Sequence, residues 1–120
     1  AELKPGVEIV LEVISFDRQV EGRDWVLTGE GRTDFQTAFG KAPVGVAKKA
    51  AAQGIPTICL SGSVGEGYEK VLLQGIEAVM SVVPCPTMTL AQCMSEAKVL
   101  VTDASEHLAR VLQVGRRMKN

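Results

Sequence analysis

The stretch of residues 29–41 concentrates side chains that can take part in acid–base, metal and phosphate chemistry. It contains two carboxylates, Glu30 and Asp34, and two cations, Arg32 and Lys41. Its other polar residues and glycines are Gly29, Gly31, Thr33, Gln36, Thr37 and Gly40. Phosphoryl transfer uses these types, because it needs a carboxylate to orient the attacking hydroxyl, another for Mg²⁺, and cations to neutralise the transferring group. The alternative is a solvated loop whose charges pair with each other.

This stretch matches neither of two common nucleotide-binding motifs. A Walker A loop would need glycine at Phe35 and serine or threonine at Ala42. The dinucleotide pattern has Asp34 where its third glycine belongs, which disfavours a dinucleotide-dependent oxidoreductase.

Two further segments follow predicted strands. Residues 61–67 (SGSVGEG) begin with Ser61, Gly62 and Ser63, whose small side chains and free amides suit an anion such as phosphate or carboxylate. Ser63 and Glu66 also have capping-box spacing, so capping of the next helix is an equal alternative. Residues 84–89 (PCPTMT) carry two prolines and no strong acid or base, which favours a rigid turn.

Three short apolar runs, at residues 24–28, 56–61 and 78–83, predict strands buried on both faces. Helical patterns precede, separate and follow them, over residues 5–14 and 42–53, from the Ser63–Glu66 cap to the stop at Gly75, and over residues 90–111. Strands separated by helices pair in parallel through right-handed crossovers, so their carboxyl ends meet at one edge. The prediction is an α/β protein, a three-layer αβα sandwich with a short parallel sheet of about three strands. Residues 1–120 are expected to form this single domain, a Rossmann-like half domain.

Composition narrows the class of partner. The 120 residues carry a net charge of -1, which gives no positive surface for a phosphate backbone, and only 4% are aromatic, which leaves few side chains to stack on bases. Nucleic acid is therefore not expected as a partner. No apolar run approaches the roughly 20 residues of a membrane span, so no membrane partner is expected. Three cysteines without metal-ligand spacing favour reduced thiols and a cytoplasmic location.

The runs DWVLTGEGRTDFQTAFGKAPVGVAKKA, GIPTICLSGSVG and GIEAVMSVVP resemble the C-terminal region of the type-2 glycerate kinase family. The resemblance covers nearly all of the chain. It implies ATP-dependent phosphorylation of D-glycerate with Mg²⁺, in a cleft between two α/β domains. The positions that match the family's signature are Gly29, Glu30, Gly31, Arg32, Asp34, Gln36, Thr37, Gly40, Lys41, Ser61, Gly62 and Ser63.

Individual roles for these residues are hypotheses. Asp34 is expected to be the hydroxyl-orienting base or a Mg²⁺ ligand, and Glu30 the other carboxylate. Arg32 and Lys41 are expected to bind phosphate or the glycerate carboxylate.

Members of the resembled family are longer than this chain, which implies that the chain is a C-terminal part of a two-domain kinase and lacks the N-terminal domain. On its own it is then expected to be inactive, and to self-associate through exposed sheet edges. The alternative is a non-catalytic, small-anion-binding or regulatory α/β domain that retains the kinase fold.

Overall fold

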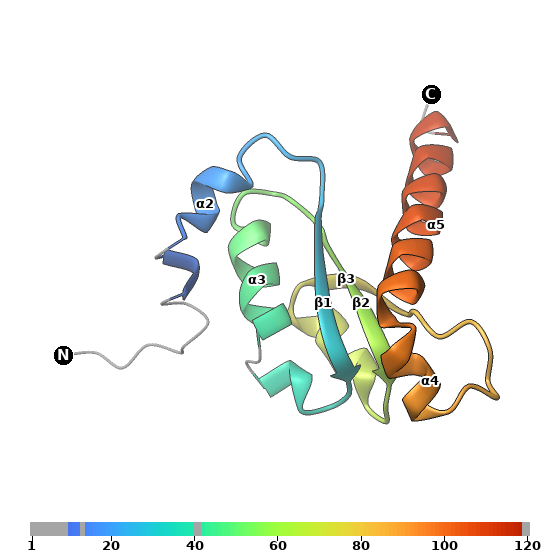
Figure 1. The fold of residues 1–120 in the computed structure, drawn as a ribbon. Helices are drawn as coiled ribbons and strands as arrows, with labels where there is room; N and C mark the ends of the chain where they lie inside the picture. Colours follow the sequence, from blue (N-terminus) through green and yellow to red (C-terminus); the bar gives the residue numbers. More distant parts are fainter. Residues whose placement is uncertain (1–9, 13, 40–41, 119–120) are drawn as a thin grey trace.

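The computed structural model describes residues 10–12, 14–39 and 42–118. Along the chain its elements are α2 (Phe16–Gln19), β1 (Val26–Thr33), the 3₁₀ helix η1 (Thr37–Phe39), α3 (Ala42–Ala51), β2 (Thr57–Val64), the 3₁₀ helix η2 (Tyr68–Gln74), β3 (Ile76–Ser81), α4 (Leu90–Ser95) and α5 (Ala97–Met118). Figure 1 shows the strands between α3 and α5. The predicted α/β class and the alternation of strands with helices are confirmed.

The three strands form one parallel sheet in the order β1-β2-β3. Each new strand is added on the same side of the previous one, so right-handed crossovers place the connecting helices on a single face. The strands therefore end together, and the chain leaves β1 and β2 at the same edge of the sheet.

The connecting helices α3 and η2 pack on one face of the sheet. A cluster of buried residues joins Val44 and Ala47 of α3 to Cys59 of β2, Val71 of η2 and Ile76 of β3. Removing these apolar side chains from water is the main force that holds this face together. Beside it, α2 and the segment before it contribute to a second cluster, composed of Leu11, Phe16, Val20, Ala50 and Ile55.

The opposite face of the sheet is covered by α5. Leu108 packs there against Ile58 and Leu60, the two residues that flank Cys59 on β2. Alternate side chains of a strand point to opposite faces, so β2 supplies both cores. This arrangement completes the three layers that the sequence predicted (Figure 1).

The strands β1 and β2 run further than the apolar runs predicted. β1 ends at Thr33 rather than at residue 28, and β2 ends at Val64 rather than at residue 61. The pairs Glu30↔Ser61 and Arg32↔Ser63 belong to the register of the two strands. Backbone pairing does not depend on apolar side chains, so it continues into polar sequence that was interpreted as loop.

The helices also depart from prediction in two places. The Ser63–Glu66 capping box is wrong, because Ser63 still belongs to β2 and η2 has Gly67 as its N-cap without a side-chain bond. The predicted single helix over residues 90–111 is two helices that meet at Glu96. The capping box of Thr89 at the start of α4 is confirmed. Most of the helix predicted over residues 5–14 lies outside the described residues.

Across the part of the chain that the structure describes, none of the helices combines the length and the apolar character of a membrane span.

Candidate functional site

A cleft of about 1150 Å³ opens on the face of the sheet that α5 covers, at the carboxyl ends of the strands. Ends of parallel strands are where α/β proteins bind ligands. Two short segments that were predicted to form the site line it, Gly29–Gly31 of β1 and Ser61–Ser63 of β2. Among the described residues that line the cleft, Glu30 has the one charged side chain.

A side chain at Gly62 would collide with the neighbouring strand end. A Cβ atom on Gly62 would lie 2.7 Å from the carbonyl oxygen of Gly31, closer than real Cβ contacts. Gly62 therefore permits the two backbones to approach beside the cleft. The same substitution at Gly31 would meet open space within 4 Å, so the constraint acts on one strand only.

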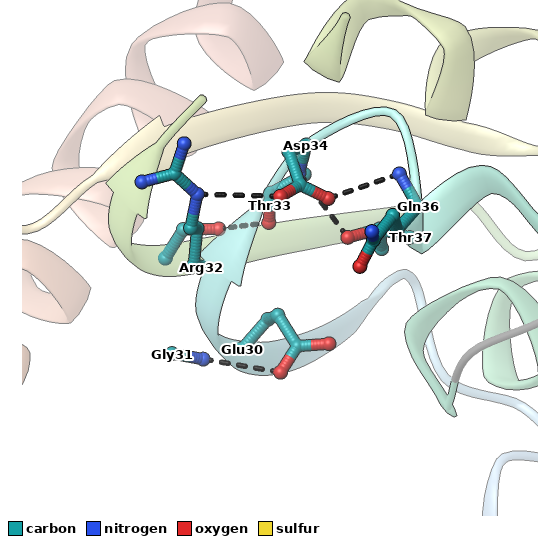
Figure 2. Close-up of polar contacts among 8 residues, drawn as sticks. Glu30, Gly31, Arg32, Thr33, Asp34, Gln36 and Thr37 are labelled. Atoms are coloured by element: carbon teal, nitrogen blue, oxygen red, sulfur yellow. Dashed lines mark hydrogen bonds and ion pairs between the residues drawn. The ribbon is translucent and has the colours of Figure 1, made fainter. Parts of the chain in front are cut away.

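The last residues of β1 lead into a tight turn around Asp34 (Figure 2). The Asp34 carboxylate accepts a hydrogen bond from Arg32 Nε at 3.2 Å and another from the Gln36 backbone N–H at 3.0 Å. The Asp34 N–H donates to Thr37 Oγ1 at 3.2 Å, and the Thr37 N–H donates to the Asp34 carbonyl at 3.1 Å. Four residues are thus joined in one polar cluster, and Thr37 is fully buried.

A buried group of hydroxyls and a thiol lies beneath this turn. Thr33, Cys59 and Ser61 are each fully buried, and the hydroxyls of Thr33 and Ser61 are hydrogen bonded to each other. The Cys59 thiol lies 3.7 Å from Thr33 Oγ1 and 3.6 Å from Ser61 Oγ. The Ser61 side chain is therefore used inside the protein, and Ser63, which is exposed, has the free hydroxyl of this segment.

The predicted site residues fall into two groups. Gly29, Glu30, Gly31, Ser61, Gly62 and Ser63 line the cleft, whereas Arg32, Asp34, Gln36 and Thr37 form the polar cluster after it. Glu30 Oε1 accepts the Gly31 N–H at 3.1 Å and makes no bond to the cluster (Figure 2). Gly40 and Lys41 lie outside the described residues.

One wall of the cleft was not predicted from the sequence. It is apolar and comes from the segment after β3 and from α4 and α5, with Val82, Val83, Met88, Leu90, Met94, Leu100 and Val101 among its residues. The sequence carried a signal, because Leu90 and Met94 belong to the periodic apolar pattern that predicted a helix over residues 90–111. They are 76% and 71% exposed.

Within the described ranges, no three His, Cys, Asp or Glu side chains converge as a metal site would require. Mg²⁺ bound through phosphates needs only one or two carboxylates. Glu30 fits that need, since one of its oxygens has no bonding partner in the described part of the chain. Asp34 fits less well, because both of its oxygens are engaged.

The segment at residues 84–89 contains a perturbed thiol. Cys85 is exposed and lies 3.0 Å from Thr87 Oγ1. Hydrogen bonds from the side chain and the backbone of Thr87 lower the pKa of the Cys85 thiol below its ordinary value, because they stabilise the thiolate.

Comparison with known proteins gives a consistent result. The model of the glycerate kinase family matches residues 1–113. A glycerate kinase of Halalkalibacterium halodurans is 46% identical over 111 residues, and a glycerate 2-kinase of Escherichia coli is 37% identical over 117 residues. These matches cover 92% and 98% of the chain, but the chain spans only 29% and 30% of the relatives' length.

A crystal structure from Salmonella typhimurium, provisionally named glycerate kinase 2, shares the fold. It matches with a TM-score of 0.71 at 33% sequence identity, over 98% of this chain and 29% of that one.

Proposed function

Because the chain belongs to the glycerate kinase family, we propose that it takes part in ATP-dependent phosphorylation of D-glycerate to phosphoglycerate. The observation that carries this proposal is the cleft at the strand ends, where the Gly29–Gly31 and Ser61–Ser63 segments meet. Since the chain spans about 29% of its relatives, we propose that it supplies one wall of a site completed by a further domain.

The reaction assigns a role to Glu30. The hydroxyl oxygen of glycerate forms a bond to the γ-phosphorus while the bond from that phosphorus to the β–γ bridging oxygen breaks, releasing ADP. The hydroxyl proton passes to a carboxylate, and Glu30 is proposed as that group because it lies at the strand end beside the cleft and one of its carboxylate oxygens has no bonding partner in the described part of the chain. Arg32 and Lys41 are proposed to neutralise phosphate or the glycerate carboxylate.

Mg²⁺ bound to the nucleotide would neutralise the charge of the phosphates. Glu30 is the residue of the described chain that could hold it, alone or through water. The apolar wall from α4 and α5 suits the base and ribose of a nucleotide better than its phosphates, because it offers no cation. The phosphates are then proposed to lie toward the strand ends and Arg32.

The test is glycerate-dependent ADP release with ATP and Mg²⁺. It is measured on this chain and on the Halalkalibacterium halodurans enzyme with this chain replacing the 111 residues that it matches. We expect turnover by the chimera only. Glu30→Gln in the chimera should reduce turnover by about two orders of magnitude or more. Glu77→Gln on β3, an exposed residue outside the cleft, is the matched control.

Each outcome decides a part of the proposal. An inactive but folded chimera would contradict it and favour a small-anion-binding domain without catalysis. Turnover by the 120 residues alone would contradict the need for a further domain. Near-normal turnover of Glu30→Gln would remove Glu30 from the proton transfer.

A further inference from the structure

We propose that Arg32 is an oxyanion-binding residue whose guanidinium is oriented by Asp34 and accommodated beside the backbone of Gly65. Asp34 is then a positioning residue rather than the base of the reaction. The anion is a phosphoryl group or a carboxylate, and its identity as nucleotide or glycerate rests on the proposed function.

Asp34 contacts Arg32 in a way that leaves the two Nη atoms of the guanidinium available to bind an anion. The contact is made by Nε at 3.2 Å, so the two Nη atoms have no hydrogen-bonding partner in the described part of the chain. These two nitrogens form the end of the fork that binds phosphate or carboxylate with two parallel hydrogen bonds. The Arg32 side chain is 63% exposed, so an anion can reach it.

Asp34 is itself held in place by hydrogen bonds, so it can hold the Arg32 guanidinium in one orientation. Its side chain is only 17% exposed, and its second oxygen accepts the Gln36 N–H. Its backbone exchanges two hydrogen bonds with Thr37. A carboxylate that contacts the guanidinium with one oxygen and a backbone N–H with the other can hold the neighbouring cation in one orientation.

Gly65 leaves room for the guanidinium on its other side. A Cβ atom on Gly65 would lie 2.5 Å from Nη2 of Arg32 and 2.9 Å from its Cζ. The guanidinium therefore occupies the space that any side chain at this position would need. The Gly65 backbone is itself held, because its N–H donates to the Thr33 carbonyl at 2.7 Å.

The surroundings of Arg32 suit an anion that also reaches the cleft. Arg32 directly follows Gly31, which lines the cleft, and its register partner on β2 is the exposed Ser63. Neighbouring strands are about 4.8 Å apart, so a tetrahedral anion on Arg32 can also reach a donor on the next strand. The Arg32–Asp34 pair adds little stability, because the guanidinium is largely exposed to water.

The two roles for Asp34 predict opposite results. Asp34→Asn removes a negative charge next to Arg32. If Asp34 were only a competing anion, this change would strengthen the binding of an added anion. If Asp34 positions the Arg32 guanidinium, binding of the anion weakens even though the net charge of the protein becomes more positive.

The experiment titrates the 120-residue chain with inorganic pyrophosphate and, separately, with D-glycerate. Binding is followed by calorimetry and by the side-chain Nε–H signal of Arg32 in NMR spectra, assigned from its loss in Arg32→Lys. The variants are Arg32→Lys, Asp34→Asn and Gly65→Ala. Their controls are Arg116→Lys, Asp103→Asn and Gly115→Ala on α5, where the added Cβ of Gly115→Ala meets nothing within 4 Å.

We expect Arg32→Lys to weaken binding about tenfold, because a bidentate charge-assisted contact is lost. Asp34→Asn and Gly65→Ala should each weaken it about threefold to tenfold, and the controls should leave it unchanged. The ligand that shifts the Arg32 signal identifies the source of the anion, pyrophosphate for a phosphoryl group and D-glycerate for a carboxylate.

Three results would overturn the proposal: binding of neither ligand, binding that Arg32→Lys leaves unchanged, or tighter binding in Asp34→Asn. Thermal unfolding of each variant shows whether it folds, and if Gly65→Ala does not, Asp34→Asn still decides. None of these results depends on turnover. If the chimera is active but no anion binds at Arg32, the proposed function is supported and only the role of Arg32 is wrong.

Discussion

The packing of α5 on the sheet depends mainly on the side chain of Leu108. Leu108 is 4% exposed and packs against Ile58 and Leu60, with Val82, Ala104 and Leu112 at the margin. Leu108→Ala removes this side chain from the centre of the contact. Because the layer also forms a wall of the cleft through Leu100 and Val101, its stability bears on the site.

The magnitude follows from burial and from the surroundings. Replacing a buried leucine with alanine destabilises a protein by about 2–5 kcal/mol, with the smaller values where neighbours can move into the space. Leu60 and Val82, which belong to the same cluster as Leu108, also line the cleft and can move into the space, so we expect a loss of about 2–3 kcal/mol in the free energy of unfolding. That is a large share of the roughly 5–15 kcal/mol typical of a domain.

Val99→Ala on the same helix is the matched control. Val99 is 60% exposed, so its truncation removes little buried surface. Alanine also has the higher helix propensity, by about 0.5 kcal/mol, which should make this variant neutral or slightly more stable. The two changes therefore differ in sign as well as in size.

Urea unfolding of the 120-residue chain, followed by far-ultraviolet circular dichroism, measures both variants. Binding of a dye that fluoresces on apolar surfaces should rise for Leu108→Ala, since α5 then covers Ile58 and Leu60 less well. A loss below about 1 kcal/mol for Leu108→Ala, or equal losses for both variants, would refute the packing of α5 on this face.

Three further predictions concern the site and its edges. Gly62→Ala should lower the free energy of unfolding by about 1–3 kcal/mol in urea titrations, because its Cβ would meet the carbonyl oxygen of Gly31. Gly31→Ala should lower that free energy by less than half as much, because its Cβ meets nothing within 4 Å. Cys85 should react with iodoacetamide at a lower pH than an ordinary thiol, because hydrogen bonds from Thr87 lower the pKa of its thiol. Thr87→Val removes the side-chain hydrogen bond and should move the pH profile of the Cys85 reaction rate to higher pH. An unchanged profile would contradict this cause. Thr89→Ala removes one arm of the capping box of α4 and should destabilise the chain by about 1 kcal/mol, and no change in thermal unfolding would mean that α4 frays already.

The order of the elements was readable from the sequence. Apolar runs such as residues 56–61 and the periodic pattern of residues 42–53 predicted β2 and α3, because burial of one strand or helix face leaves a regular signature. Parallel pairing followed from their alternation, and with it the meeting of the strand ends at one edge. The residues around Glu30 and Ser61 could therefore be selected as one site before the structure was known.

The sequence determined which residues gather at the strand ends, and tertiary structure decided what each one does there. Glu30 and Asp34 carry the same chemical group, but Glu30 has one carboxylate oxygen without a partner in the described part of the chain, whereas Asp34 is hydrogen bonded at both oxygens. The apolar wall from α4 and α5 was likewise not predicted, because a periodic pattern shows that a helix has an apolar face and does not show what lies against it. Local sequence encodes backbone state and amphipathicity, whereas contacts between segments distant in the chain depend on how the whole chain packs.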